Sequence, residues 1–223
     1  MNMKISDKTK NVLENFSNIN SSIVVKKGNV LKTVSPQKNI IAVYECEESF
    51  EHNFAIYDLG QFLGGLTIFK DADFDFSNEK YVVISSGKSK VKYYYCDASL
   101  ITTSQKELPD LTVDVQFNLS NDILNSINKA AKIYDLTDIS LTGDGTEMSL
   151  IVKDKEDVTS NNFSVVVGTT SKIFTANFKV ENLKIIPDNY TVQISFPNVS
   201  TFISSNHKLT YLIALEPDSS IME

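Results

Sequence analysis

The pattern of apolar and polar positions repeats once along the chain. Two apolar stripes have the spacing of one helix face. The first consists of Val12, Leu13, Phe16 and Ile19, and the second, 111 residues later, of Ile123, Leu124, Ile127 and Ala130. Each stripe leads into an apolar strand and a glycine turn, at Gly28 and at Gly143. The sequence therefore predicts two half-chains with the same plan, as in molecules built by symmetry.

Helical periodicity recurs a second time in each half, over a shorter segment. The four expected helices cover residues 6–20, 58–66, 120–134 and 179–185. Ser6 and Ser120 can cap the two longer helices, because a serine hydroxyl accepts a hydrogen bond from a free backbone N–H of the first turn. Pro187 is expected to end the last helix, since the residue before a proline avoids the helical conformation.

Apolar and alternating runs between the helices predict many strands. They cover residues 22–25, 30–34, 40–44, 54–56, 73–76, 81–85, 91–96, 113–119, 139–141, 148–152, 163–167, 172–176, 191–196 and 209–214. Strands outnumber helices, and the helices need sheets to pack on. We therefore expect an α+β protein of two similar domains, residues 1–108 and 109–223, each with two helices packed on antiparallel sheets. The polar stretch 102–110 is the expected linker.

The composition is sufficient for two hydrophobic cores, because 42% of the 223 residues are hydrophobic. No apolar run approaches the roughly 20 residues of a membrane span, and the N-terminus lacks the apolar core of a signal peptide. Cys46 and Cys96 are too few for a disulfide framework and are expected to be buried, reduced thiols. These observations predict a cytoplasmic protein with no membrane partner.

The charged residues limit how the chain can bind nucleic acid. The net charge is −7, from 28 acidic residues against 21 basic ones, and every basic residue is a lysine. Lysine meets a phosphate as a hydrated point charge, whereas arginine offers a fixed fork that also reads guanine. The chain is therefore poorly equipped to read a DNA sequence, although it could hold DNA loosely.

The sequence offers little catalytic chemistry. His52 and His207 lie in polar segments without a nucleophile or a metal-ligand pattern beside them. Nucleophile-elbow and phosphate-loop motifs are absent. The carboxylates gather in expected loops such as residues 45–51, where a solvated acidic surface is a better explanation than a hydrolase site. We expect no catalytic residue, no metal and no cofactor.

Lysines recur on the polar faces of the expected helices. Lys10 lies opposite the first apolar stripe with Lys4 near its start, Lys129 and Lys132 lie opposite the second stripe, and Lys184 flanks the fourth helix. Solvated faces often carry lysine. Lysines on duplicated helices of an acidic protein also fit a ring that is positive inside and negative outside.

Four segments carry a family resemblance that spans nearly the whole chain in order. Residues 13–23 resemble the first helix and strand of the sliding clamp of T4-like phages, and residues 55–64 its second helix. Residues 187–190 are similar to its late turn, and residues 211–219 to its C-terminal strand and tail. The likeness is weakest over 67–110 and 142–175.

The resemblance implies the DNA-clamp fold and a homotrimeric, pseudo-sixfold ring whose helices surround double-stranded DNA. It implies a processivity factor that tethers a DNA polymerase, with no enzyme activity and no sequence preference. It further implies an ATP-driven clamp loader complex, a role with late transcription factors, and action in the cytoplasm of the infected bacterial host. A closed ring needs only weak, sliding contacts to phosphate, which lysine supplies.

Three groups of residues are then candidates for function. The DNA-facing pore would carry Lys4, Lys10, Lys129, Lys132 and Lys184. The subunit interface would use the edge strands with Tyr93, Tyr94 and Tyr95 in one half and Phe163 and Val165 in the other. A client-peptide pocket would be formed by Tyr211, Ile213, Ala214, Leu215 and Pro217, beside the strand 40–44 and the linker residues Leu108 and Pro109.

Two alternatives remain open at this point. A β-rich structural virion or tail protein would also lack catalytic residues, and its duplication would only build an oligomer. The lysines discriminate, because they would cluster in a central hole of a clamp and scatter over a structural protein. For the client pocket, Tyr211 and Ile213 could equally be ordinary sheet core.

Overall fold

The two apolar stripes form the helices α1 (Asp7–Ile19) and α3 (Asn121–Ile133), as predicted. Both begin at the expected serine. Ser6 Oγ accepts a hydrogen bond from Thr9 N at 3.2 Å, and Ser120 Oγ accepts one from Ile123 N at 3.3 Å. Most stripe residues are buried. Local sequence therefore determines where these helices begin and which face packs inward.

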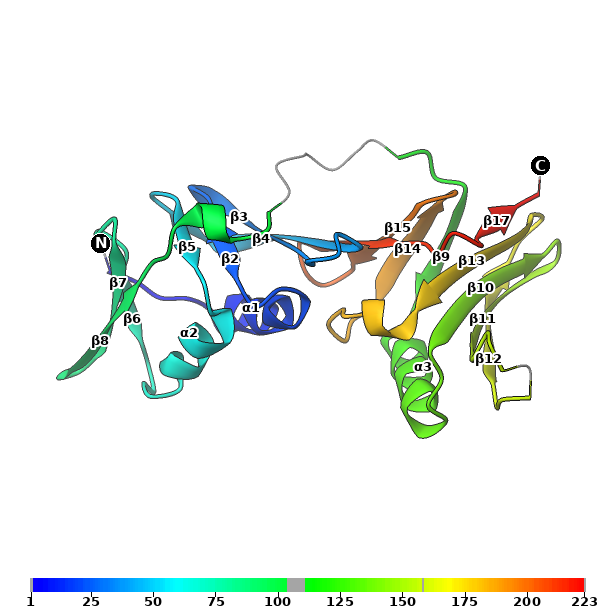
Figure 1. The fold of residues 1–223 in the computed structure, drawn as a ribbon, viewed down its shortest axis with the longest axis horizontal. Coiled ribbons are helices and arrows are strands. Elements are labelled where there is room, and N and C mark those ends of the chain that lie inside the picture. The colour runs from blue at the N-terminus through cyan, green and yellow to red at the C-terminus, as the bar shows by residue number, and fades with distance from the viewer. Residues whose placement is uncertain (1, 104–110, 158, 223) are drawn as a thin grey trace. The chain divides into compact units, whose positions relative to one another are not determined.

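The computed structural model describes residues 2–103, 111–157 and 159–222 (Figure 1). The chain divides into a first unit, Met1–Glu107, and a second unit, Leu108–Glu223. The expected linker residues Leu108 and Pro109 lie outside the described residues. In the part of the chain that is described, no helix is long and apolar enough to cross a membrane.

In the first unit, α1 and the shorter α2 (Leu59–Leu66) pack on each other. Asp58 caps α2 by accepting a hydrogen bond from Gln61 N at 2.7 Å. The strands form antiparallel pairs throughout. One sheet has the order β1 (Asn2–Met3), β6 (Asp73–Asp75), β7 (Tyr81–Ser86) and β8 (Ser89–Tyr94); β2 (Ile23–Val25) pairs with β5 (Phe54–Ile56), and β3 (Gly28–Val34) with β4 (Ile40–Phe50).

The second unit has two antiparallel sheets and α3. One sheet has the order β12 (Phe163–Thr169), β11 (Glu147–Lys153), β10 (Asp138–Asp144), β13 (Ile173–Lys179) and β17 (Ser220–Ile221). The other has β16 (Leu209–Ala214), β15 (Val199–Ser204), β14 (Tyr190–Ser195) and β9 (Val115–Leu119) in that order. Strand β15 was not among the predicted strands, because serine or threonine occupies three of its six positions and its apolar residues do not alternate regularly.

The prediction of a helix over residues 179–185 is wrong. Lys179 is the last residue of β13, and only the single 3-10 turn η2 (Val180–Asn182) follows. The ladder between β13 and β10 extends to the pair Asp138–Lys179, so pairing across the sheet takes the residues that would start a helix. The described residues therefore contain two α-helices in the first unit and one in the second.

The expected acidic loop over residues 45–51 is also wrong, because β4 continues to Phe50. Its residues alternate regularly. Cys46, Glu48 and Phe50 are buried, whereas Glu45 and Glu47 are exposed. The alternation was hidden in the sequence because a glutamate occupies one of the inward positions. Likewise, the strand predicted over 91–96 covers Ser89–Tyr94.

Candidate functional site

The exposed face of α3 carries lysines and carboxamides. Lys129 and Lys132 are exposed and lie three residues apart, on the same face as Asn125 and Asn128. No carboxylate among the described residues forms an ion pair with either lysine. The one acidic side chain of the helix, Asp122, is in its first turn. A negative charge there interacts favourably with the positive end of the helix dipole. This face can donate several hydrogen bonds to anionic groups without a fixed geometry.

The lysines expected at α1 have carboxylate partners. Lys10 Nζ lies 3.0 Å from Asp7 Oδ1, and Lys4 Nζ lies 2.5 Å from Asp71 Oδ2. The hydrogen bond to Asp71 raises the pKa of Lys4, and the bond from Lys4 lowers the pKa of Asp71. The charge on Lys10 lowers the pKa of Asp71 as well. Lys10 is thus paired with Asp7 and Lys4 with Asp71, and both lysines lie near the start of α1.

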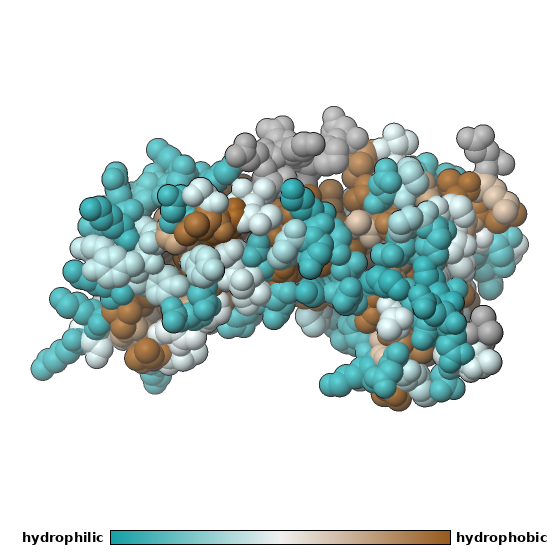
Figure 2. Space-filling model, viewed as in Figure 1, coloured by the Kyte–Doolittle hydropathy of each residue, from teal (hydrophilic) through white to brown (hydrophobic). Residues whose placement is uncertain are grey.

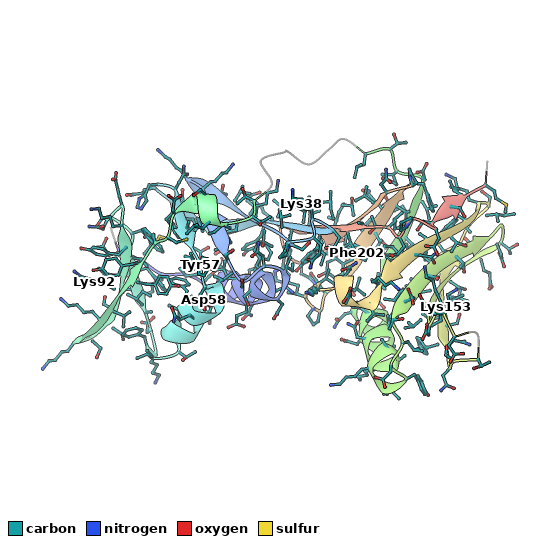
Figure 3. The ribbon with its side chains drawn as sticks, in the orientation of Figure 1. Lys38, Tyr57, Asp58, Lys92, Lys153 and Phe202 are labelled. Atoms are coloured by element: carbon teal, nitrogen blue, oxygen red, sulfur yellow. The ribbon has the colours of Figure 1, made fainter. Side chains whose placement is uncertain are left out.

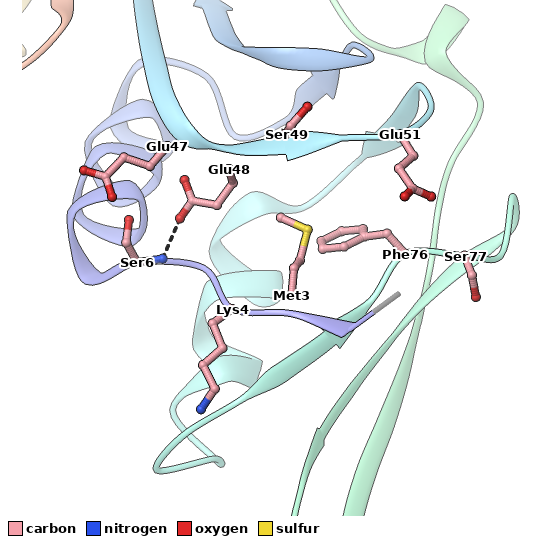
Figure 4. Close-up of a pocket in the computed structure, with 9 residues that line it drawn as sticks. All are labelled: Met3, Lys4, Ser6, Glu47, Glu48, Ser49, Glu51, Phe76 and Ser77. Atoms are coloured by element: carbon pink, nitrogen blue, oxygen red, sulfur yellow. Dashed lines mark hydrogen bonds between the residues drawn. The ribbon is translucent and has the colours of Figure 1, made fainter.

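Lys4 also lines a cavity of about 480 Å³ at the start of α1 (Figure 4). Met3 and Phe76 supply its apolar part, and glutamates of β4 supply its polar part. Glu48 accepts hydrogen bonds from Ser6 N at 2.6 Å and from Thr9 Oγ1 at 2.7 Å. Burial alone would raise the pKa of Glu48, but these two bonds outweigh it and lower the pKa. The buried glutamate therefore anchors the start of α1.

The remaining candidate lysine, Lys184, is exposed after η2. Its neighbour Lys179 has a structural contact instead, because its Nζ lies 2.6 Å from Oδ1 of Asp138, whose side chain is 0% exposed. Thr137 Oγ1 and Lys155 N also donate to Asp138, at 2.8 and 3.3 Å. Of the candidate pore lysines, the structure therefore groups Lys129 with Lys132 and Lys4 with Lys10.

The three consecutive tyrosines near β8 point in different directions. Tyr93 packs inward, donating to Asp58 O at 3.0 Å. Its ring meets that of Phe62 edge to face at 5.2 Å. Tyr94 is 66% exposed on the other face of the strand, 5.4 Å from the ring of Tyr81. Tyr95 follows the strand and stacks on Phe54 at 4.9 Å. Of the three tyrosines, only Tyr94 is mostly exposed.

Among the described residues, each unit has a sheet whose edge strand pairs with a neighbour on one side only. In the first unit this strand is β8, which pairs with β7, and Lys92 lies on it (Figure 3). In the second unit it is β12, which pairs with β11. Phe163 and Val165 are half-buried on β12, and the neighbouring Val166 is 53% exposed. Both strands that the sequence analysis chose are thus sheet edges.

The residues of the expected client pocket divide into two groups. Tyr211 and Ile213 are 0% exposed. Tyr211 Oη accepts a hydrogen bond from Ile186 N at 3.3 Å, so both residues belong to the sheet core, the alternative left open by the sequence. Leu215 is largely buried, Ala214 is half-buried and Pro217 is exposed. Only Ala214 and Pro217 offer appreciable surface.

The described residues contain no cluster of three or more histidine, cysteine, aspartate or glutamate side chains that could hold a metal ion. Cys46 and Cys96 are free thiols, and burial raises the pKa of Cys46 to about 11, which keeps it protonated at neutral pH. Among the described residues, sequence reasoning missed the buried Glu48 and three exposed lysines: Lys88 in the turn before β8, and Lys90 and Lys92 on that strand. The alternation of those lysines was the signal that could have found them.

Comparison with known proteins places this geometry in a family. Residues 4–103 match the family model for the DNA polymerase processivity factor. The sliding clamp of Vibrio phage KVP40 is 31% identical over 96% of this chain and 99% of its own length. The sliding clamp of Enterobacteria phage T4 is 25% identical over 98% and 99% of the two chains.

A likeness in structure agrees with these relatives. The A. fulgidus PCNA, solved with the C-terminal region of FEN-1, matches this chain with a TM-score of 0.73 at 15% identity, covering 98% of both chains. The architecture is thus the DNA-clamp fold. A structural virion protein, the alternative that the sequence left open, accounts for none of these similarities. The chain belongs to the sliding clamps of T4-like bacteriophages, which are DNA polymerase processivity factors.

Proposed function

We propose that three copies of this chain close head to tail into a ring around double-stranded DNA and tether the phage DNA polymerase to its template. As a processivity factor the chain is not an enzyme. In this proposal it acts by encircling DNA and by contacting the polymerase. The observation that carries the proposal is the pair of one-sided edge strands, β8 in the first unit and β12 in the second.

Edge strands of two different kinds favour a closed ring. An edge exposes unpaired N–H and C=O groups, and joining β8 of one copy to β12 of the next satisfies both. Such a head-to-tail contact is heterologous, and it closes when the rotation between copies divides a full turn. With two similar units per copy, three copies give a pseudo-sixfold ring.

Solution mass together with DNA retention tests this proposal. A ring held by topology should remain on nicked circular DNA after loading and slide off linear DNA with free ends. Light scattering at micromolar concentration should give three times the chain mass. A stable monomer or closed dimer, or equal retention on circular and linear DNA, would contradict the proposal.

We expect neutralisation of Lys129 and Lys132 together to shorten residence on DNA without unfolding the chain. Each lysine supplies one weak, sequence-independent phosphate contact, so either single change to alanine should have a small effect. The plot of log affinity against log salt should be less steep for the double variant, by a slope of about two, because two phosphate contacts are lost. The exposed lysines Lys70 and Lys80, which lie outside α3 and outside both edge strands, provide the control. If the double variant supports processive synthesis at the wild-type level, Lys129 and Lys132 are simply exposed to solvent and do not contact DNA.

A client peptide of the polymerase is proposed to bind at the end of β16, with Ala214, Leu215 and Pro217 contributing its apolar surface. Changing the exposed Pro217 to aspartate should abolish stimulation of the polymerase, because a charge would replace apolar contact area at a site where few residues carry the affinity. Mass in solution should stay unchanged. Full stimulation by this variant would place the client elsewhere.

The wider setting follows from the same ring. A closed ring must be opened before it can be placed around DNA, so we propose an ATP-driven clamp loader complex as a partner. The loader, and not this chain, would bind the ATP. Late transcription factors are proposed as further clients. The phage relatives support a location in the cytoplasm of the infected bacterial host, where free thiols such as Cys46 persist.

A further inference from the structure

A groove of about 810 Å³ lies in the first unit, between the strands β2 and β3 with their connecting turn and the segment that follows β8. It shares no residue with α1, the edge strand β8 or the end of β16. Its lining consists of Ser22, Ile23, Val24, Lys26, Lys27, Gly28, Asn29, Val30, Lys32, Thr33, Val34, Ala98, Ser99, Ile101, Thr102 and Thr103.

One buried side chain ties together the two segments that line this groove. Asn20 Nδ2 donates to Val34 O at 2.9 Å and to Thr102 O at 3.4 Å, which ties β3 to the segment after β8. Asn20 Oδ1 accepts from both the backbone N and the Oγ of Ser22, each at 3.0 Å. Asn20 is largely buried, so its amide is held in place. Two hydrogen bonds from this amide therefore join the two walls of the groove, and two more hold Ser22, the residue before β2.

The turn between β2 and β3 also lines the groove. Lys27 N donates to Asn53 Oδ1 at 2.7 Å, and Gly28 has a φ of +116°, a conformation that side-chain-bearing residues rarely adopt. This turn presents the side chains of Lys26 and Lys27, both exposed, at the mouth of the groove. Their position follows from an anchored turn and does not depend on a flexible loop.

The groove is positive although the chain is acidic. Among the described residues that line it, three are lysines and none is an aspartate or glutamate, in a chain of net charge −7. Glu45, which pairs with Val30 in the β3–β4 ladder, and Asp97, which precedes Ala98, keep their negative charge but are not among the described lining residues. A concave surface of one sign attracts the opposite charge.

The groove also has apolar surface and free strand edges. Val30, on β3, is 48% exposed, and Ile101, which is largely buried, lines the opposite wall. Figure 2 shows hydrophobic surface over the short helix η1 (Ala98–Leu100), whose Leu100 is exposed. Within the described part of the first unit, β2 pairs only with β5 and β3 only with β4. Each strand therefore has one side on which an added segment could form main-chain hydrogen bonds.

We propose that this groove binds an extended, acidic polypeptide segment of a partner protein, with an aliphatic or aromatic side chain seated against Val30 and Ile101. Lys26 and Lys27 would meet the acidic side chains, and a strand edge would meet the peptide backbone. Duplex DNA fits this site poorly, because its phosphates would use the lysines and leave the apolar surface at Val30 without a partner. The proposal needs only the first unit and does not depend on ring closure.

The full chain can be tested with a fluorescein-labelled peptide in which aspartate alternates with leucine, followed by fluorescence anisotropy. Changing Lys26 and Lys27 together to glutamate should weaken binding by roughly tenfold or more, since two attractive ion pairs are replaced by repulsion. The matched control changes Lys70 and Lys80, two exposed lysines of the first unit outside the groove, to glutamate. The control should bind the peptide within the error of the unchanged chain.

A second variant tests the apolar contact separately. Val30→Thr keeps the shape and strand preference of the side chain but replaces a methyl group by a hydroxyl, so binding should weaken about fourfold. Equal peptide binding by the unchanged chain and the Lys26/Lys27 variant would overturn the proposal, as would no binding by the unchanged chain. Preferential binding of single-stranded oligothymidylate, lost in the same variant, would show a nucleic-acid site and overturn it too.

Discussion

Val166→Asp is expected to convert the ring into folded monomers. Val166 is 53% exposed on β12, the strand that pairs only with β11 within the described residues. In the proposed ring this strand is covered by β8 of the next copy, so the substitution would bury an unpaired carboxylate at each of the three contacts. An unpaired buried charge costs about 3 kcal/mol or more, which weakens each contact by at least roughly a hundredfold.

The measurement combines solution mass with processive synthesis. The variant should sediment as a monomer at micromolar concentration and should lose retention on circular DNA, while its circular dichroism stays that of the unchanged chain. Val113→Asp is the matched control, because Val113 is an exposed valine outside both edge strands. If the Val166 variant stays trimeric and processive, β12 is not at the subunit contact.

Lys179→Ala is expected to destabilise the second unit by about 2 kcal/mol. The Asp138 carboxylate is fully buried, and Lys179 is its charged partner at 2.6 Å. Removing one member of a buried pair typically costs about 3–5 kcal/mol, and the 34% exposure of Lys179 reduces that cost, because water can reach the pair. Lys155→Ala is the matched control: its Nζ pairs with the exposed Asp218, and its backbone N still donates to Asp138.

The same pair gives stability a defined pH dependence. Burial would raise the pKa of Asp138, but hydrogen bonds from Lys179 and Thr137 outweigh it, and the folded pKa lies below the ordinary aspartate value. The contribution of the pair is therefore fully present above the ordinary aspartate pKa and is lost as the pH falls through the folded value. Urea unfolding of the second unit, followed by circular dichroism, should show a smaller acid sensitivity in Asp138→Asn. Equal stability of Lys179→Ala and the unchanged chain at neutral pH would contradict the role of the pair.

The candidate site was partly predictable from sequence. The exposure of Lys129 and Lys132 follows from helical periodicity alone, since three residues separate neighbours on one face. The edge positions of β8 and β12 were also expected from their apolar and aromatic composition. The pairing of Lys4 with Asp71 could not be expected, because the two residues are far apart in sequence and only the fold brings them together.

The sequence by itself determined the features that depend on neighbouring residues: the helix starts at Ser6 and Ser120, the buried stripes and the repeated plan. Tertiary structure decided the features that depend on distant partners. Glu48 lies inside because Ser6 N and Thr9 Oγ1 satisfy its carboxylate. Lys179 ends a strand because β10 supplies its ladder and Asp138 its counter-charge. A buried charge is tolerated only where such partners converge, and that convergence is a property of the fold.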